Sequence, residues 1–399
     1  MKYRISLIES LVAAGAIATL PLFSLNAAAQ IAVSSNDGKV VLVNGVVGVP
    51  ANAVEDTVTV INLGVSPPKV IAEFKATSSV AGPPQNVAVA PDESFSLIAS
   101  SMKLDPADPK KQVPDNRLSV IDLKAKPPAV IATLESGLGP NGLAINKAGT
   151  LALVANRHEG TVSIFTIAGN KLTAAGKIDF GDPKSSPSSV AFTPDGKTAL
   201  VTRDGDHRIS VLSVDGSTVT DTKRVMTGGF RPYAIEVSPK GDIAVVGNQG
   251  ANAGDIMPVH VIDLTGKAPR IVLTGKAPRI VSTVDVGQYI EDLAFSDDGK
   301  FLAVIPQNGS NLAPSHPFYN DHGLLVVFSV NGTKLTKVAE VNIGKWPQGV
   351  AWSRDGKTLL AQSMVDNALA VISFNGKSLK VTGQLKVTGG PDGIRTAGH

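Results

Sequence analysis

The stretch PSSVAFTPDGKTALVTR at residues 187–203 holds the pattern on which the whole chain is built. It contains two short runs rich in apolar and β-branched residues, and each run is typical of a β-strand. Asp195-Gly196 lies between them, and glycine supplies the positive φ that a tight hairpin turn requires. The stretch therefore predicts a two-stranded antiparallel hairpin.

The same hairpin pattern recurs along the chain at intervals of 45 to 58 residues. The other copies are PQNVAVAPDESFSLIAS from Pro84, PNGLAINKAGTLALVAN from Pro140, PYAIEVSPKGDIAVVGN from Pro232, IEDLAFSDDGKFLAVIP from Ile290 and PQGVAWSRDGKTLLAQS from Pro347. A third alternating run such as RISVLSV follows each hairpin, and most copies add a fourth strand-like run. Four antiparallel strands per unit at this period are typical of β-propeller blades.

The two ends of the chain complete the count. IAVSSND at residues 31–37 matches a second strand, DTVTVINL and KVIAEFKA follow as third and fourth strands, and PDGIRTAGH at residues 391–399 offers the missing first strand. We predict an all-β fold, a seven-bladed β-propeller with four antiparallel strands per blade. It forms a single domain over residues 30–399, closed by N- and C-terminal strands in one blade, which removes exposed sheet edges. Alternatively, the N-terminal residues supply their own first strand.

Residues 1–29 have the pattern of a cleaved secretory signal peptide. Lys2 and Arg4 precede an apolar run over residues 11–25, and an alanine triplet follows at residues 27–29. The apolar run is shorter than the roughly 20 residues of a spanning helix. We therefore expect a periplasmic or secreted protein with no membrane anchor after signal cleavage.

Composition excludes several classes of function. The 399-residue chain contains no cysteine, which rules out disulfides and thiolate chemistry. Its formal net charge is only +3, whereas a nucleic-acid-binding protein normally carries a strongly basic face. We expect no nucleic-acid partner, and we expect a monomer whose partner is a small polar ligand or another protein.

The repeats resemble those of a known group of proteins. Openings such as VAFTPDGK at residues 190–197 and third strands such as LSVIDL at residues 118–123 resemble the bacterial YVTN-type propeller repeats, which are WD40-like, and the related lactonase-like seven-bladed propellers. The resemblance covers nearly all of the mature chain and implies the propeller fold. It leaves function open, because propellers support binding, hydrolytic, lyase and redox roles on one scaffold.

Long insertions are expected on one face of the propeller. Successive turns of a meander alternate between the two ends of its strands, so second-to-third-strand loops share a face with the connections between blades. We call this the loop face. Insertions at residues 37–56, 100–116 and 308–323 fall there. Long loops gathered on a rigid scaffold commonly carry function.

Polar residues at the ends of second strands and in between-blade connections are predicted to point toward the channel mouth on the loop face. The candidate ligand-binding residues are Asn141, Asn156, Arg203, Arg231, Tyr233, Asn248, Gln307, Trp346, Gln348 and Asp392. A ring of hydrogen-bonding groups would bind a small polar ligand. Alternatively, these residues only cap strand ends and bind channel water.

Glu291 places a carboxylate where other copies carry Gln, Asn, Ser or Tyr, and is the first catalytic candidate. The further catalytic candidates are the loop histidines His158, His207 and His322, as general bases or metal ligands. Alternatively, Glu291 simply pairs with Arg231 or Lys345.

Glu291 is also the centre of a candidate metal site. The other candidate ligands are Asn141, Asn156 and Asn248. Carboxylate and amide oxygens are ligands that Ca²⁺ and Mg²⁺ accept. Such an ion would polarise a substrate carbonyl and activate water, as in some lactone-hydrolysing propellers.

These residues and the resemblance together favour a lactonase-like hydrolase of esters or lactones. One alternative is a non-catalytic periplasmic binding or scaffold propeller for a partner protein or polymer. Another is a subunit of a periplasmic redox enzyme.

One further repeat concerns sequence alone. TGKAPRIV occurs at residues 265–272 and again at residues 274–281. We expect it in a third-to-fourth-strand hairpin, away from the loop face, as the scar of a tandem duplication rather than a basic binding strip.

Overall fold

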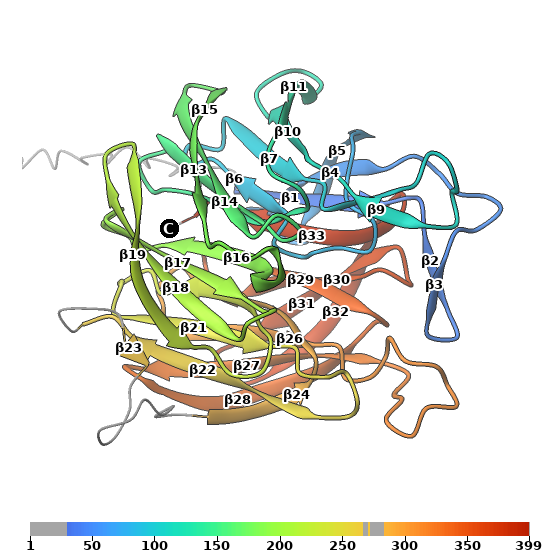
Figure 1. Cartoon of the computed structure of the whole chain (residues 1–399). Coiled ribbons are helices and arrows are strands. Elements are labelled where there is room, and N and C mark those ends of the chain that lie inside the picture. The colour runs from blue at the N-terminus through green and yellow to red at the C-terminus, as the bar shows by residue number, and fades with distance from the viewer. Residues whose placement is uncertain (1–29, 266–269, 272–282, 399) are drawn as a thin grey trace, which may run out of the picture.

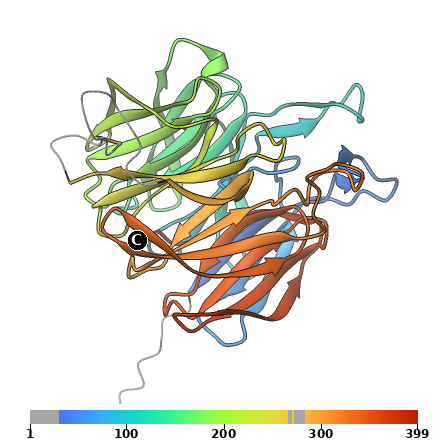
Figure 2. The same cartoon turned by 90° about the horizontal axis from the view of Figure 1, so that it is seen from below.

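The computed structural model describes residues 30–265, 270–271 and 283–398. Seven main β-sheets form the molecule, and Figures 1 and 2 show from two directions that they are arranged around a central axis, which we call the channel. All pairings within these sheets are antiparallel, and each blade has a first strand beside the channel and a fourth strand outside. The predicted seven-bladed β-propeller is confirmed. Within the described residues, no helix is long and apolar enough to cross a membrane.

We number the blades from the N-terminus and give their strands from the channel outward. Blade 1 contains β33 (Gly390–Thr396), β1 (Ile31–Asp37), β4 (Thr57–Asn62) and β5 (Lys69–Lys75). Blade 2 contains β6 (Val87–Val89), β7 (Phe95–Ala99), β10 (Arg117–Asp122) and β11 (Ala129–Glu135). Blade 3 contains β12 (Pro140–Ile145), β13 (Leu151–Asn156), β14 (Thr161–Ala168) and β15 (Lys171–Asp179). Blade 4 contains β16 (Pro187–Phe192), β17 (Thr198–Arg203), β18 (Arg208–Asp215) and β19 (Thr218–Thr227).

The remaining blades follow the same order. Blade 5 contains β20 (Pro232–Val237), β21 (Ile243–Asn248) and β22 (Ile256–Asp263), with β23 (Arg270–Ile271) and β24 (Thr283–Gln288) both paired to β22. Blade 6 contains β25 (Ile290–Phe295), β26 (Phe301–Pro306), β27 (Gly323–Asn331) and β28 (Lys334–Ile343). Blade 7 contains β29 (Pro347–Trp352), β30 (Thr358–Ser363), β31 (Ala368–Phe374) and β32 (Leu379–Lys386). A single 3₁₀ turn, η1 (Pro183–Ser185), joins blades 3 and 4.

Blade 1 closes the ring with strands from both ends of the chain. β33 pairs with β1, with Val33 opposite Arg395 and Ser34 opposite Ile394. The predicted closure is therefore confirmed, and the alternative of an N-terminal first strand is wrong. The pairing places β1 between β33 and β4, so β1 is not left as an open sheet edge.

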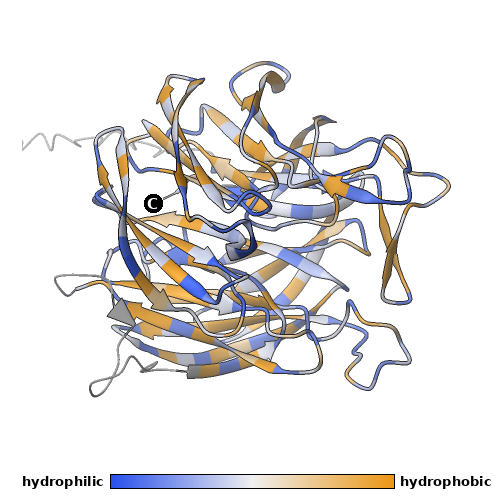
Figure 3. Ribbon diagram, in the orientation of Figure 1, coloured by the Kyte–Doolittle hydropathy of each residue, from blue (hydrophilic) through white to orange (hydrophobic). Residues whose placement is uncertain are grey.

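The core lies between neighbouring blades. Leu97 and Val120 of blade 2, for example, are buried in one cluster with Val154 and Phe165 of blade 3. Fully burying such a side chain contributes about 1.5–3 kcal/mol. Fourth strands such as β5 and β11 instead alternate exposed and half-buried residues, and Figure 3 shows the resulting mixture of hydropathy on the outer strands.

The loop face carries the long insertions as expected. Two of them form small hairpins, β2 (Val41–Val43) with β3 (Val46–Gly48) and β8 (Met102–Leu104) with β9 (Gln112–Pro114). Figure 1 shows β2, β3 and β9 projecting from one side of the molecule. At the tip of the first hairpin, the backbone of Gly45 lies so close to Ala313 that a Cβ on Gly45 would sit 2.4 Å from the Ala313 nitrogen. Two of the three insertions therefore touch.

The TGKAPRIV duplication and the signal peptide lie largely or wholly outside the described residues. β23 lies within the first copy and β24 follows the second, with Arg270 opposite Asp263 and Thr283 opposite His260 on β22. Both strands thus occupy the fourth-strand position of blade 5.

Candidate functional site

The centre of the candidate site is Glu291, the second residue of β25, which is only 6% exposed. Its Oε1 accepts a hydrogen bond of 2.6 Å from Gln307 Nε2, and its Oε2 accepts one of 3.3 Å from Gln249 Nε2. Burial raises the pKa of Glu291 to about 8, and the neighbouring Asp292 charge acts in the same direction. Glu291 can therefore hold or release a proton near neutral pH.

Two arginines stand next to Glu291 and share one carboxylate. Asp204 Oδ2 accepts from Arg157 Nη2 at 2.6 Å and from Arg231 Nη2 at 3.2 Å. Arg231 Nη2 also donates to Gln249 Oε1 at 2.9 Å. A continuous hydrogen-bonded chain thus connects Arg157 to Glu291, and the single carboxylate of Asp204 neutralises only one of the two guanidinium charges.

Two tyrosines stack against these arginines. The Arg157 guanidinium lies 5.8 Å from the centre of the Tyr233 ring, and that of Arg231 lies 6.0 Å from the Tyr289 ring. Burial raises the pKa of Tyr289 to about 12 and also raises the pKa of Tyr233. Both phenols keep their proton at neutral pH and remain hydrogen-bond donors.

Two of these residues hold a conformation that side chains seldom adopt. Arg231 and Tyr289 immediately precede the first strands β20 and β25, and their φ angles are +57° and +55°. In blade 3 the same position is Gly139, for which such an angle carries no steric cost. A non-glycine residue there costs about 1 kcal/mol or more. Ser186 and Trp346, which precede β16 and β29, have the same positive φ, so this angle belongs to the start of a blade and not to the cluster alone.

Several predicted ligand-binding residues do not face the channel mouth. Asn156 accepts from Ser136 Oγ and the Gly137 nitrogen, and donates to Thr161 Oγ1 and Ser163 Oγ, at 2.9 to 3.1 Å. Thr161 and Ser163 lie on the third strand of blade 3, and Ser136 and Gly137 lie in the connection from blade 2. The expected orientation of Asn156 toward the channel is therefore wrong, because its amide bonds to an outer strand of its own blade and to that connection.

Arg203 and Asn248 occupy the same position in the next two blades and behave alike. Arg203 donates to Ser210 Oγ and pairs with Asp206 within blade 4. Asn248 Nδ2 donates to the Pro258 carbonyl within blade 5 at 3.0 Å. Their expected orientation toward the channel is wrong for the same reason.

The other residues of the predicted ring lie in two groups. Gln307, Arg231 and Tyr233 belong to the Glu291 cluster, and Asn141 joins them by a hydrogen bond with Tyr233 and one of 2.7 Å to the Ser188 carbonyl.

The second group lies in blades 1 and 7. Asp392 accepts from Ser35 Oγ at 2.6 Å and Ser78 Oγ at 2.8 Å, and burial raises its pKa to about 8. Trp346 is 7% exposed and its nitrogen donates to Ser310 Oγ, while Gln348 is 1% exposed.

The three candidate histidines sit in surface loops around the cluster. His158 follows Arg157, and burial lowers its pKa, as does the Arg157 charge. His207 packs edge-on against Phe230, and its Nδ1 accepts from the Arg231 nitrogen at 3.3 Å. His322 Nδ1 lies 2.6 Å from Asp321 Oδ1. Their catalytic role stays a prediction, and His207 is the one bonded to a residue of the cluster.

Sequence reasoning missed Arg157, Asp204 and Gln249. Each comes one residue after a position that was chosen, namely Asn156, Arg203 and Asn248. A shift of one residue along a strand moves a side chain to the opposite side. The signal was present in blade 6. There Gln307 follows Pro306, and Pro306 pairs with Ile290 in the same register in which Asn156 pairs with Pro140 in blade 3.

The cluster presents mainly hydrogen-bond donors. Arg157, Arg231, Gln249 and Gln307 all direct N–H groups at carboxylate or amide oxygens. Among the residues that the structure describes, no group of three or more His, Asp or Glu side chains is arranged to hold a metal ion.

Comparison with known proteins identifies similar propellers. Residues 116–284, less than half of the chain, match a family described as lactonase, 7-bladed beta-propeller. That segment contains Arg157, Asp204, Arg231 and Gln249. No curated protein matches the sequence.

Solved structures extend the similarity in fold. A "putative 6-phosphogluconolactonase" from Bacteroides fragilis has a TM-score of 0.69 and 16% identity, covering 94% of this chain and 99% of that one. A periplasmic gluconolactonase from Pseudomonas aeruginosa has a TM-score of 0.62 and 16% identity, covering 92% and 99%. Residues 116–284 are thus similar in sequence to lactonase propellers, and the solved structures share the propeller fold over nearly the whole chain.

Proposed function

We propose that the protein is a hydrolase that opens a lactone or ester bound at the Glu291 cluster on the loop face. The observation that carries the proposal is a buried carboxyl group with a raised pKa, joined through Gln249 to two partly exposed arginines. The lactonase family match over residues 116–284 supports the same reaction class.

The residues suggest a division of labour. Arg157 and Arg231 would bind the substrate carbonyl and stabilise the negative charge that develops on its oxygen when water attacks. Glu291 in its ionised form would take a proton from that water, and would return it to the alkoxide released as the ring opens. Tyr233 and Tyr289, as neutral donors, would orient the substrate's hydroxyl groups.

The cluster fits an anion or an oxyanion better than a divalent cation. Both oxygens of Glu291 already accept from amide groups, and Asn156 and Asn248 make hydrogen bonds within their own blades. A Ca²⁺ or Mg²⁺ ion would need those oxygens and would meet two guanidinium charges. We therefore expect hydrolysis to survive exposure to a chelator.

The test measures hydrolysis of a panel of sugar lactones and simple esters by the purified parent protein and by purified Glu291→Gln. This variant keeps the size of the side chain and removes the proton-transfer group, so we expect kcat to fall by about 100-fold or more. Circular dichroism and melting temperature should match the parent protein. The double variant Glu291→Gln, Gln307→Glu moves the single carboxyl to the other side of the same hydrogen bond, so it is the charge-matched control and should be as inactive as Glu291→Gln. Equal hydrolysis by Glu291→Gln and the parent protein would contradict the proposal.

We also propose that the protein works in the periplasm. The proposal rests on the pattern of residues 1–29 and on the fold shared with a periplasmic gluconolactonase. N-terminal sequencing of the protein from a periplasmic extract should give Gln30 as the first residue. A retained Met1 in the soluble cytosolic fraction would contradict it.

A further inference from the structure

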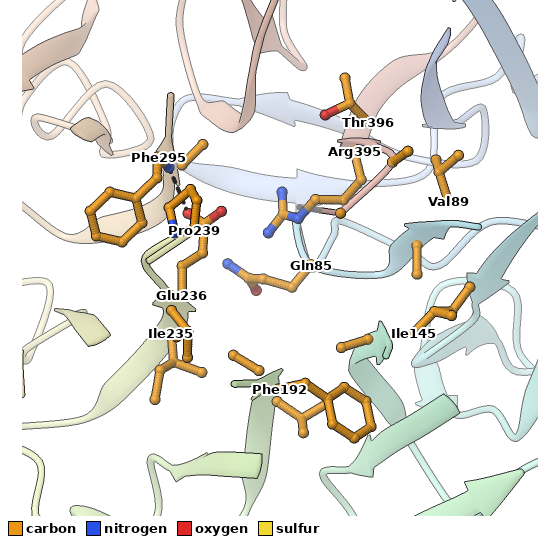
Figure 4. Close-up of a pocket in the computed structure, with 18 of the residues that line it drawn as sticks. Gln85, Val89, Ile145, Phe192, Ile235, Glu236, Pro239, Phe295, Arg395 and Thr396 are labelled. Carbon is orange, nitrogen blue, oxygen red and sulfur yellow. Dashed lines mark hydrogen bonds between the residues drawn. The ribbon is translucent and has the colours of Figure 1, made fainter. Parts of the chain in front are cut away.

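The central channel contains a cavity of about 170 Å³ at the end opposite the loop face (Figure 4). The first strands of all seven blades contribute to its wall. Its apolar lining includes Val89, Ile145, Phe192, Ile235, Phe295 and Trp352. A cavity of about 150 Å³ is large enough to hold benzene, so this one can take a small ring.

Three polar side chains converge on this apolar space. Figure 4 shows Gln85, Glu236 and Arg395 pointing toward one another at one side of the cavity. Gln85 is 2% exposed, and its Nε2 donates to the Glu291 carbonyl at 2.7 Å and to Asp292 Oδ1 at 3.2 Å. Its Oε1 is buried and has no hydrogen-bond partner among the described residues. A buried acceptor of this kind is costly unless a ligand or water supplies a donor.

The charges around the cavity are balanced without a ligand. Arg395 donates to both oxygens of Asp292, at 2.8 and 2.9 Å, so the two groups neutralise each other. Glu236 Oε2 accepts from the Phe295 nitrogen at 2.9 Å. Burial raises the pKa of Glu236 to about 8, against the opposing effect of Arg395, so this carboxyl is mainly neutral at pH 7.

The cavity is distinct from the Glu291 cluster. Along β25, Glu291 is followed by Asp292, and the cavity-lining residues Ala294 and Phe295 come after both. The hydrogen bonds of Asp292 to Arg395 and Gln85 form a polar layer between the two compartments. A ligand in the cavity therefore meets different residues from a substrate on the loop face.

We propose that this cavity is a second ligand-binding site, which takes a small neutral molecule with an apolar body and one hydroxyl group. The hydroxyl donates to Gln85 Oε1 and accepts from the protonated Glu236, while the apolar strands enclose the body. A charged ligand would lose hydration against the apolar wall, and the buried Arg395 and Asp292 already neutralise each other, so neither offers it a counter-charge. This inference goes beyond the proposed hydrolysis and does not depend on it.

The probe is benzyl alcohol, titrated by calorimetry into the mature chain, with benzoate and benzylamine as charged molecules of the same shape. We expect a dissociation constant on the order of 1 mM for benzyl alcohol, because its few heavy atoms limit the affinity. Benzoate and benzylamine should bind at least about tenfold more weakly. No binding of benzyl alcohol up to its solubility limit, or a preference for either ion, would overturn the proposal.

Variants locate the site. Ala294→Leu fills the cavity from its wall and should abolish binding, and Ala144→Leu does the same from β12 if the first variant fails to fold. Gln85→Met removes the free acceptor and should weaken binding about tenfold. Glu291→Gln should leave binding unchanged, and Ala294→Leu should leave lactone hydrolysis unchanged, so the two proposals fail separately. Binding that survives both filled cavities, or is lost in Glu291→Gln, would place the ligand elsewhere.

Discussion

At the scale of single residues, neighbours in sequence have opposite tasks. Asn156 is fully buried and makes four hydrogen bonds, two within blade 3 and two to the connection from blade 2. Arg157, the next residue, instead reaches Asp204 of blade 4 and the Glu291 cluster. The same alternation separates Arg203 from Asp204 and Asn248 from Gln249. At each of these strand ends, therefore, the first polar residue stabilises the blade and the next residue faces the channel.

This division predicts a double contrast between two alanine variants. Asn156→Ala leaves buried donors and acceptors without partners and should lower the free energy of unfolding by on the order of 3 kcal/mol. The molecules of this variant that remain folded should still catalyse hydrolysis. Arg157→Ala leaves Asp204 paired with Arg231, so its stability cost should be smaller, but kcat/KM for lactones should fall about 100-fold. Urea unfolding and steady-state kinetics on both proteins measure this. The reverse pattern would contradict the division.

At the scale of elements, the repeat predicted the blades because each hairpin carries its own turn and alternation. Strand pairing in blade 1, with sequence partners more than 350 residues apart, followed from counting strands. The site was less accessible to sequence reasoning. Glu291, Gln307, Arg231 and Tyr233 were found, but Arg157 and Gln249 were missed, because the register at a strand end decides which of two adjacent residues faces the channel.

The TGKAPRIV duplication gives a prediction at the same scale. In blade 1, the residues paired with Asn62 and Thr59 are Lys69 and Glu73, four apart, and blade 2 has the same step from Ala129 to Thr133. In blade 5 the equivalent partners are Arg270 and Thr283, thirteen apart. The spacing in blade 5 is nine residues longer, which equals the offset between the two copies of TGKAPRIV that begin at Thr265 and Thr274.

Deleting residues 272–280 should therefore restore the four-residue spacing between pairing partners that is found in blades 1 and 2. We expect the melting temperature to stay within error of the parent protein or to rise slightly, since shortening a loop changes closure entropy by only about 0.6 kcal/mol per halving. Lactone hydrolysis should be unchanged. Scanning calorimetry and kinetics on the deletion variant provide the measurement, and a large loss of either quantity would assign the segment a role.

At the scale of the whole molecule, the channel concentrates carboxyl groups that are buried without full compensation. Glu236, Glu291 and Asp392 each have a pKa of about 8, raised mainly by burial. A raised pKa means that the folded protein binds these protons more tightly than the unfolded chain. Each group therefore adds stability that is fully present below its ordinary pKa and is lost as pH rises through about 8.

The stability of the protein should consequently fall from pH 7 toward pH 8 and level off above that. Each of the three carboxyls contributes at most about 1.4 kcal/mol per pH unit, and its share shrinks as the folded protein releases the proton. The lowered pKa values of His158 and His260 act in the opposite direction, but only below about pH 6.5, where the unfolded imidazoles become charged. Urea unfolding at pH 7, 7.5, 8 and 8.5 measures the slope of the free energy of unfolding against pH. Glu236→Gln should make this slope shallower, because it removes one titrating carboxyl. A flat or rising profile would mean that these carboxyls are ionised in the folded protein, which would also remove the proton that Glu236 is proposed to donate to a hydroxyl ligand.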